Sequence, residues 1–387
     1  MSRGLIVLFA VATGQAVASN YLAQPLLDAI RREFAVSSGV AGLIVTSAQV
    51  GYAAGLILLL PLGDLLERRG LITALAGITA VSLAAAGAAP SIGLFMGAAG
   101  LVGLTSVMAQ ILVPFAASLA PAAERGRVVG TVMSGLLLGI LLARTAAGLV
   151  AQIAGWRAVY WLAAVLMLGM TFVLHRTLPI YRERTALDYP RLLGSVFVIA
   201  RAEPILRRRA AFAVTSFASF SVLWTSLAFM LAREPYTYGE GTIGLFGLVG
   251  AAGALTASLA GRFSDRGWSR RLTGAAAVIL VAAYPVVWLG GASLAALIAG
   301  ILILDIGAQT LHITNQGEIY RLRPEARSRV NAFYMTACFI GAAGGSAASA
   351  FVYGARGWAG VCVLGTLVGL AALALWIVEL RRGPVVA

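Results

Sequence analysis

Four polar side chains recur at helical spacing inside an otherwise apolar stretch, at i, i+4, i+7 and i+11: Asp305, Gln309, His312 and Gln316. This spacing places them on one face of a helix. A polar face toward lipid is costly, so we expect it to face an aqueous cavity or other protein. A carboxylate there can bind and release a proton, so we predict that Asp305 couples transport to protons, with His312 as a relay. A lone histidine in such a place is more often a buried, hydrogen-bonded side chain, and both interpretations of His312 stay open.

A second ionisable residue, Arg144, lies inside the apolar stretch 128–153. An ionisable group in mid-membrane is expensive and is by default functional. Arg144 lies 17 residues after Arg127, and Asp305 lies 16 residues before Arg321. At about 1.5 Å per residue, both charges are then about 25 Å from the same membrane edge, so we predict that they pair.

Other polar residues follow weaker patterns within the apolar stretches. Asn20, Gln24 and Asp28 repeat at i, i+4 and i+8, although Asp28 is close enough to the outer surface to be a solvated helix end. Hydroxyls in membrane helices mostly bond nearby backbone, so we expect Thr215, Ser219 and Ser226 to be structural. We assign amides and one aromatic side chain to a solute-binding cavity: Asn20, Gln24, Gln110, Trp224, Gln309 and Gln316.

The elements that carry these residues are long apolar runs. Of the 387 residues, 60% are hydrophobic and 11% are charged, which excludes a water-soluble fold. A hydrocarbon core of about 30 Å needs about 20 apolar residues per helix. The runs are unbroken rather than alternating, so they predict helices and not strands. We predict an all-α membrane protein with twelve transmembrane helices, at 4–27, 38–62, 71–89, 92–117, 128–153, 157–177, 209–232, 241–262, 272–289, 291–317, 329–353 and 357–380.

The basic residues set the orientation of these helices. All 29 are arginine, and the net charge of +14 would suggest nucleic acid as a partner of a soluble protein. Here 23 arginines lie in the termini and alternate loops, whereas five lie on the other side: Arg31, Arg32, Arg157, Arg233 and Arg356. The positive-inside rule then predicts that both termini are cytoplasmic and that no nucleic acid binds. We expect a multi-pass monomer of a bacterial inner membrane, with the first span retained rather than cleaved as a signal peptide.

The second half of the chain repeats the first with an offset near 202 residues. Gly155-Trp156 matches Gly357-Trp358, and Gly42 matches Gly244. This repeat predicts two pseudo-symmetric six-helix bundles, at 1–177 and 209–387. The polar segment 178–208 joins them as a cytoplasmic linker. Leucines, valines and an isoleucine give its middle an apolar face, which predicts a short helix lying on the inner leaflet.

Two motifs indicate a family. Pro61 to Gly70, with Asp64, Arg68 and Arg69, resembles G-x-x-x-D-R-x-G-R-R, except that Leu65 replaces the arginine after the aspartate and Glu67 replaces the later glycine. A second copy, from Gly261 to Arg266, keeps G-x-x-x-D-R. The stretch from Gly135 to Gly148 resembles the antiporter motif G-x-x-x-G-x-x-x-G-P-x-x-G-G, with Arg144 in place of proline. Over its whole length the chain resembles the major facilitator superfamily, and within it the twelve-span proton antiporters that export drugs or sugars.

The resemblance implies how the parts act. Spans one, four, seven and ten line a central cavity in that family, and spans two, five, eight and eleven flank the seam between the halves. Glycines on spans five and eleven would then form a moving interface between the bundles, with ordinary helix packing as the alternative. The resemblance also implies a cytoplasmic gate, in which Asp64 approaches the start of span eleven. Its residues would be Asp64, Arg68, Arg69, Asp265, Arg266 and Arg329.

These inferences together predict a secondary active transporter that works by alternating access and exports a small amphiphilic or sugar-like solute in exchange for protons. A proton-coupled importer or exchanger of a small organic anion bound by Arg144 is the alternative. The chain has no nucleophile elbow, no His-Glu-x-x-His pair and no phosphate-cradling loop, so we do not expect an enzyme or a cofactor. Cys338 and Cys362 have no metal-ligand spacing, and we expect both to pack as small apolar residues. A passive channel is disfavoured because a six-plus-six repeat suits two moving halves better than a fixed pore.

Overall fold

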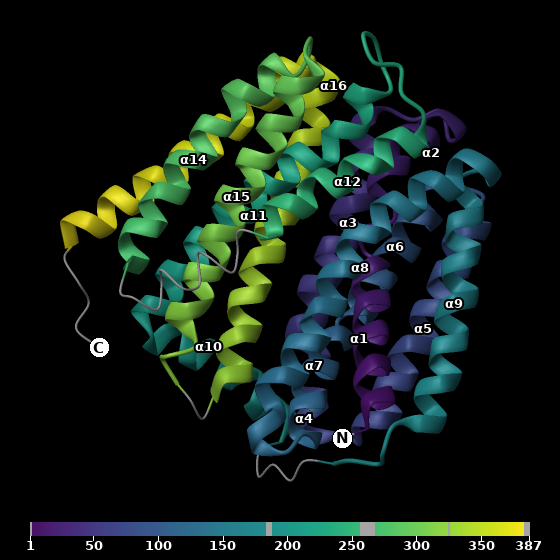
Figure 1. Cartoon of the computed structure of the whole chain (residues 1–387), viewed down its shortest axis with the longest axis vertical. Coiled ribbons are helices and arrows are strands. Elements are labelled where there is room, and N and C mark those ends of the chain that lie inside the picture. The colour runs from purple at the N-terminus through teal and green to yellow at the C-terminus, as the bar shows by residue number, and fades with distance from the viewer. Residues whose placement is uncertain (1, 183–187, 256–267, 324–325, 383–387) are drawn as a thin grey trace. The chain divides into compact units, whose positions relative to one another are not determined.

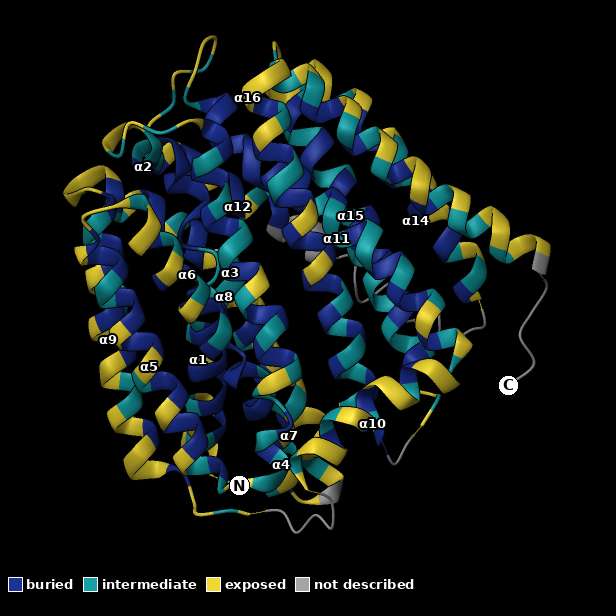
Figure 2. Ribbon diagram, turned by 180° about the vertical axis from the view of Figure 1, so that it is seen from behind, coloured by how far each residue is buried: buried dark blue, intermediate teal, exposed yellow. Residues whose placement is uncertain are grey.

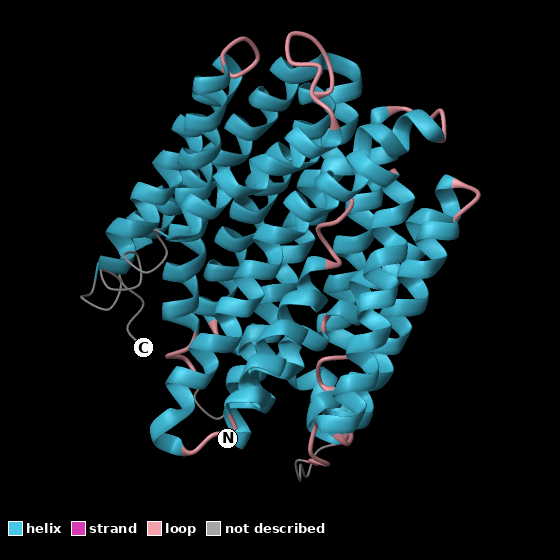
Figure 3. Cartoon of the chain, turned by 45° about the vertical axis from the view of Figure 1, so that its right-hand side comes forward, coloured by secondary structure: helices cyan, strands magenta, loops and turns pink. Residues whose placement is uncertain are grey.

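The computed structural model describes residues 2–182, 188–255, 268–323 and 326–382. Throughout these ranges the chain consists of helices joined by short loops, without strands (Figure 3). The two cysteines are buried and unbonded. In a helix every backbone N–H and C=O in the middle is hydrogen-bonded within the helix itself. An open sheet would leave the backbone groups of its edge strands unpaired, and lipid has no groups to bond them. The prediction of an all-α protein is therefore confirmed in the described residues.

The long helices follow the predicted spans closely (Figure 1). In the first half they are α1 (Arg3–Ala18), α3 (Ser38–Leu58), α5 (Arg68–Ala88), α6 (Ile92–Ser106), α7 (Met108–Leu119), α8 (Arg125–Ala154) and α9 (Trp156–Thr177). Between the halves lies α10 (Tyr189–Ala202). In the second half they are α11 (Pro204–Leu231), α12 (Glu240–Leu255), α14 (Ser269–Leu289), α15 (Leu294–Ile319) and α16 (Arg327–Arg382).

Nine helical segments of the described chain are long and apolar enough to cross a membrane. The helices α6 and α7 together form one of these segments, and α1 and α12 are shorter apolar helices. The long α16 contains two predicted spans, because Gly357 adopts φ 62° and ψ −157° and interrupts the helix. A left-handed φ favours glycine, which explains the residue at this break.

The first predicted span ends earlier than its hydropathy indicates. Its helix α1 stops at Ala18, turns follow, and the chain continues through a 3₁₀ turn at Gln24–Leu26 into α2 (Leu27–Glu33). Pro25 has no N–H to donate and its ring would clash with a carbonyl four residues earlier, which disfavours a regular helix through this segment. The predicted helix over 4–27 is therefore interrupted, and Asn20, Gln24 and Asp28 do not lie on one continuous helix.

The internal repeat is visible in the backbone. Gly155 and Gly357 occupy equivalent positions, and both have positive φ, at 81° and 62°. Each precedes a tryptophan at the start of the last helix of its half. Trp156 packs edge-on against Phe95, and Trp358 donates its indole N–H to the carbonyl of Val287. The two halves thus start their sixth helices with the same glycine conformation.

The helices group into two compact units. The first comprises residues 1–30, 47–194 and 240–247, where α1 packs on α8 and α5 packs on α9 and α6. The second comprises residues 31–46, 195–239 and 248–387, where α11 packs on α16 and α14 packs on α15. The start of α12 thus belongs to the first unit, and the start of α3 belongs to the second.

Exposed residues lie along the outer helices (Figure 2), and many of them are large apolar residues. On α9, Val165, Leu166, Leu168 and Phe172 are each more than half exposed. A continuous apolar surface of this kind is costly in water and favourable in lipid. Its presence agrees with a membrane-embedded chain.

Candidate functional site

Arg144 is buried inside the first unit, with only 3% of its surface exposed. Its Nε donates a hydrogen bond of 2.5 Å to Oε1 of Gln24, and its guanidinium lies over the ring of Tyr21 at 5.0 Å. The break after α1 allows this contact, because it turns Tyr21 and Gln24 out of a regular helix. Gln24 and Tyr21 are neutral residues, and their contacts position the guanidinium.

Glycines of α12 pack against the same part of α8. A Cβ on Gly247 would lie 2.9 Å from the Cβ of Arg144, and the hydroxyl of Thr145 donates to the carbonyl of Gly244 at 3.1 Å. The backbones of Gly148 and Gly244 also meet directly. Small residues allow such close approach between membrane helices. Residues 240–247 therefore hold the backbone of α8 around Arg144.

Asp305 of α15 is equally buried, in the second unit, with 3% of its surface exposed. Its Oδ1 accepts the indole N–H of Trp224 at 3.4 Å, and Trp224 is itself 3% exposed. A Cβ on Gly250 would lie 2.6 Å from Oδ2 of Asp305 and 2.9 Å from the indole ring. A carboxylate, an indole and a helix backbone thus meet in one compact group.

His312 lies two turns further along α15 among aromatic rings. Its Nδ1 is 3.0 Å from the hydroxyl of Tyr334, and the two rings stack at 5.7 Å between centroids. Phe217 meets the imidazole edge-on at 5.2 Å. These contacts fit a hydrogen-bonded buried histidine, whereas its role as a proton relay stays a prediction.

Of the remaining predicted cavity residues, Gln110, Gln309 and Gln316 lie on the expected helices, whereas Asn20 does not. Nε2 of Gln110 donates to the hydroxyl of Tyr52 at 3.3 Å. Gln309 and Gln316 are half-buried on α15, the single unbroken helix that also carries Asp305 and His312. Asn20 is half-buried in the turns after α1. The hydroxyl of Ser226 bonds that of Ser349 at 2.6 Å, which agrees with a structural role.

The motif between α3 and α5 forms a compact polar turn. Nη2 of Arg68 lies 3.7 Å from Oδ1 of Asp64, and its Nε donates to the carbonyl of Gly63 at 3.0 Å. Arg68 is buried, and its guanidinium lies over the Tyr181 ring at 5.2 Å. Glu67, which replaces the usual glycine, accepts the backbone N–H groups of Arg69 and Gly70 in the first turn of α5, at 2.7 and 2.8 Å. The departure from the motif thus provides an N-cap.

The structure describes the other predicted gate residues only in part. Arg69 and Arg329 are half-buried at the starts of α5 and α16. Asp265 and Arg266 lie outside the described residues. The gate as a whole stays a prediction.

The glycines of spans five and eleven do not all pack alike: Gly148 of span five meets Gly244 of span eight, whereas Gly139 and Gly345 meet helices of their own half. A Cβ on Gly139 would lie 2.6 Å from the Cα of Gly14 on α1, and one on Gly345 would lie 2.7 Å from the Cα of Ala218 on α11. Both glycines therefore pack inside their own half, as the alternative of ordinary helix packing expected. Hydropathy could not reveal this, because it does not show which face of a glycine-rich helix meets which neighbour.

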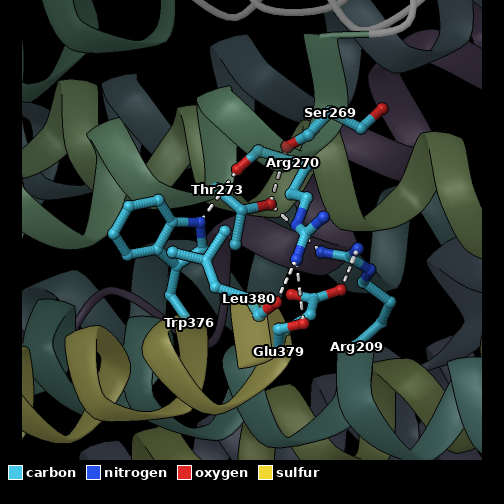
Figure 4. A network of polar contacts seen from close by, with 7 residues as sticks. All are labelled: Arg209, Ser269, Arg270, Thr273, Trp376, Glu379 and Leu380. Carbon is cyan, nitrogen blue, oxygen red and sulfur yellow. Dashed lines mark hydrogen bonds and ion pairs between the residues drawn. The ribbon is translucent and has the colours of Figure 1, made fainter. Parts of the chain in front are cut away.

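A separate polar cluster joins three helix ends of the second unit (Figure 4). Arg209 pairs with Glu379 at 2.9 Å and also donates to the hydroxyl of Thr273 at 3.1 Å. Arg270 donates to the backbone carbonyls of Glu379 and Leu380, which lie in the last turn of α16. Through this ion pair and these hydrogen bonds, the cluster links the first turns of α11 and α14 to the last turn of α16.

Sequence reasoning missed several partners of the predicted residues. The sequence pattern did not single out three of these partners: Tyr21 beside Arg144, Tyr334 beside His312 and Gly250 beside Asp305. Tyr21 alone had a local hint, since it lies three residues before Gln24 in a polar segment interrupted by proline. The other two are far away in sequence, and only helix packing brings them to the site.

Known proteins agree with this architecture. The chain is 53% identical over 376 residues to the Escherichia coli O157:H7 protein named Uncharacterized transporter YgaY, covering 97% of this chain and 95% of that one. It is 35% identical over 364 residues to Probable transporter SCO4007 of Streptomyces coelicolor, covering 94% and 84%.

Solved transporters share the fold at low sequence identity. A bacterial homologue of the human lysosomal transporter Spinster, in an inward-facing and occupied conformation, superposes with a TM-score of 0.80 at 15% identity, covering 98% of this chain and 97% of that one. The nucleoside transporter NupG superposes with a TM-score of 0.77 at 12% identity, covering 96% and 98%. These similarities confirm the twelve-helix, two-domain fold.

Residues 9–317 match the family described as the Major Facilitator Superfamily. This match covers most of the chain, and the relatives that cover nearly all of it are named as transporters. The chain therefore belongs to the major facilitator superfamily of membrane transporters.

Proposed function

We propose that this transporter exports a small amphiphilic or sugar-like solute across the bacterial inner membrane in exchange for protons. The observation that carries the proposal is the carboxyl group of Asp305, buried in mid-helix and hydrogen-bonded to Trp224. A carboxyl group at such a depth is expensive unless it is paired or protonated, so proton binding can change how the helices pack around it.

Arg144 is the proposed charge partner of Asp305. The two residues are buried to the same degree and are predicted at matching depth in the membrane. Both pack against α12, Arg144 at Gly247 within the first unit and Asp305 at Gly250 within the second. Protonation of Asp305 would remove the attraction between the charges and favour movement of the halves, 1–177 and 209–387, by alternating access.

The test uses the purified protein in liposomes that contain a pH-sensitive dye. Compounds from a panel of amphiphiles, sugars and organic anions are added one at a time, and proton flux is recorded. We expect flux with some amphiphiles or sugars, no proton-driven transport in Asp305→Asn, and partial retention of downhill solute exchange in that variant. Unchanged proton-driven transport in Asp305→Asn would exclude Asp305 as the coupling residue.

A second candidate is proton-coupled import or exchange of a small organic anion. It is favoured by the guanidinium of Arg144, which neutral Gln24 and Tyr21 hold in place. A guanidinium is well suited to bind a carboxylate by two parallel hydrogen bonds. In the same panel, only organic anions would then be transported, and Arg144→Gln would abolish their transport. A neutral compound that needs Asp305 and tolerates Arg144→Gln would exclude this candidate.

We also propose that α10 lies on the inner leaflet within a cytoplasmic linker at 178–208. Its exposed face combines Phe197 and Val198 with the arginines Arg191 and Arg201. Apolar residues between arginines favour the interface of an anionic membrane. An environment-sensitive dye on Phe197→Cys should report an apolar surrounding in liposomes; a water-like emission there would exclude the proposed placement.

A further inference from the structure

We propose that Trp224 is a positioning residue for Asp305, and that the two side chains form a proton-sensitive pair whose indole reports the charge of the carboxyl group. This inference rests on the proposed role of Asp305 in coupling. It assigns to Trp224 a role other than contact with the solute.

The geometry of the pair carries the inference. Trp224 Nε1 points its hydrogen at Oδ1 of Asp305 over 3.4 Å, and both residues are almost completely buried. Phe220, one turn earlier on α11, packs against the indole at 5.9 Å between centroids. The indole is therefore held against the carboxyl group by helix packing as well as by the hydrogen bond.

The backbone of α12 closes the other side of the pair. An added Cβ on Gly250 would lie 2.6 Å from Oδ2 of Asp305 and 2.9 Å from Cζ2 of Trp224. Real Cβ atoms essentially never come so near to other heavy atoms, so a side chain at this position has to displace the carboxyl group or the ring. Glycine at position 250 thus keeps the indole and the carboxyl group together.

Two other titratable side chains of the second unit that the structure describes lie near the pair, on α14 and α15. Tyr284 of α14 lies within electrostatic range of Asp305, next to Cys362 of α16, and donates its hydroxyl to the carbonyl of Ser219 at 2.6 Å. His312 lies two turns away on α15 and bonds Tyr334. Arg144 is the proposed partner from the first unit.

An indole N–H bonds a carboxylate more strongly than a protonated carboxyl group, because a charged acceptor strengthens the bond. The indole therefore favours the charged form of Asp305 over its protonated form. When a proton binds, the bond to the indole weakens, and the surroundings of the ring change. Tryptophan emission depends on such surroundings, so Trp224 should respond to the charge of Asp305.

The test titrates the purified full-length protein in lipid nanodiscs with pH alone, so no solute is needed. The emission of Trp224 is taken as the difference between the wild type and Trp224→Phe. Protonation of Asp305 is followed by the infrared band of its protonated carboxyl group, identified by its absence in Asp305→Asn. Trp288→Phe serves as the matched control, since Trp288 is 55% exposed on α14.

The expected result has three parts. The emission of Trp224 changes with pH at the same midpoint as the infrared band, and this change is absent in Asp305→Asn. In Trp224→Phe, the midpoint of the infrared band moves to higher pH by about one unit, a ten-fold change in proton concentration, whereas Trp288→Phe leaves it in place. Gly250→Ala also shifts the midpoint, and it tests the pair if Trp224→Phe does not fold.

Other results would overturn the inference or separate it from the proposed function. An infrared midpoint that is the same in Trp224→Phe and Gly250→Ala as in the wild type would show that Trp224 does not position Asp305. An emission change that persists in Asp305→Asn would show that the indole senses another group. If Asp305→Asn abolishes proton-driven transport while either of these results is found, the proposed function stands and the inference fails. If the pair titrates as expected but proton-driven solute transport persists in Asp305→Asn, the proposed function fails and the inference stands.

Discussion

Gly148 of α8 and Gly244 of α12 meet backbone to backbone, such that a Cβ on Gly148 would lie 2.9 Å from the Cα of Gly244. The internal repeat relates Gly148 to Ala350 and Gly244 to Gly42, and these two residues are also in direct contact. The two contacts therefore involve equivalent positions of the repeat. One joins spans five and eight, and the other joins spans two and eleven. Such small residues are what allow two membrane helices to approach closely.

A leucine at position 148 should separate α8 from α12. Its side chain has no space against the backbone of Gly244, and overpacking of this kind costs about 1–3 kcal/mol. We expect Gly148→Leu to abolish the disulfide cross-link between cysteines placed at Gln152 and Gly241, two positions that are in contact. Gly130→Leu is the control, because a Cβ there has no neighbour within 4 Å. Equal cross-linking in both variants would mean that this contact tolerates a large side chain.

Replacement of Arg144 by lysine should impair transport although it conserves the charge. Lysine has no planar group to lie over Tyr21 and no Nε–H to donate to Gln24. Loss of a hydrogen bond from a charged group costs about 1.5–3 kcal/mol, so the initial rate of proton flux should fall about ten- to hundred-fold. The control is Arg127→Lys, since Arg127 is exposed and pairs with Glu124. A wild-type rate in Arg144→Lys would show that charge alone is required.

Asp64→Asn should favour the state that is open to the cytoplasm. Asp64 forms an ion pair with buried Arg68, and the predicted gate also places it near the start of α16. Losing one partly buried charge contact should shift the balance between states by about 1–2 kcal/mol, or about five- to thirty-fold. Labelling of Gln316→Cys by an impermeant maleimide from the cytoplasmic side should become faster by a similar factor. The gate role would be refuted by equal labelling rates with and without Asp64→Asn.

Glu379→Ala should destabilise the second half of the protein. Arg209 and Glu379 pair at 2.9 Å with side chains only 6% and 13% exposed, so the substitution leaves a buried guanidinium without its counter-charge. Breaking such a pair typically costs about 3–5 kcal/mol. Thermal unfolding in detergent should shift down by several degrees, whereas Asp188→Ala, which removes the exposed pair with Arg191, should leave it nearly unchanged. Equal unfolding temperatures would mean that the cluster does not stabilise the fold.

The arginine distribution predicts which loops face the cytoplasm. A single cysteine at Ser91, in the loop between α5 and α6, should react with an impermeant maleimide added to intact cells. One at Arg323, before α16, should react only after permeabilisation. Ala292 offers a second outer position, preferable to Gly290, whose added Cβ would lie 2.8 Å from Leu297. Labelling of Arg323→Cys in intact cells would reverse the orientation.

The sequence by itself determined the fold of this protein, because both the apolar runs and the internal repeat can be read directly from the order of residues. A run of about 20 apolar residues can be satisfied only by a helix across the membrane. The predicted end of the sixth span at 177 and the predicted start of the last span at 357 accordingly agree with the structure. The burial of Arg144 and Asp305 also followed from their positions within apolar runs.

Only the tertiary structure decided which side chains meet. Gln24 reaches Arg144 across 120 residues, and Arg209 reaches Glu379 across 170, by contacts that depend on how each helix is rotated about its axis. Hydropathy does not fix that rotation when a helix is apolar on every side. The sequence predicts that the glycines of α8 pack closely against another helix. Because hydropathy does not fix this rotation, the sequence does not predict that Gly135 and Gly139 meet α1. Packing between helices depends on shape complementarity between residues that are far apart in sequence. It therefore cannot be predicted from any one segment of the chain.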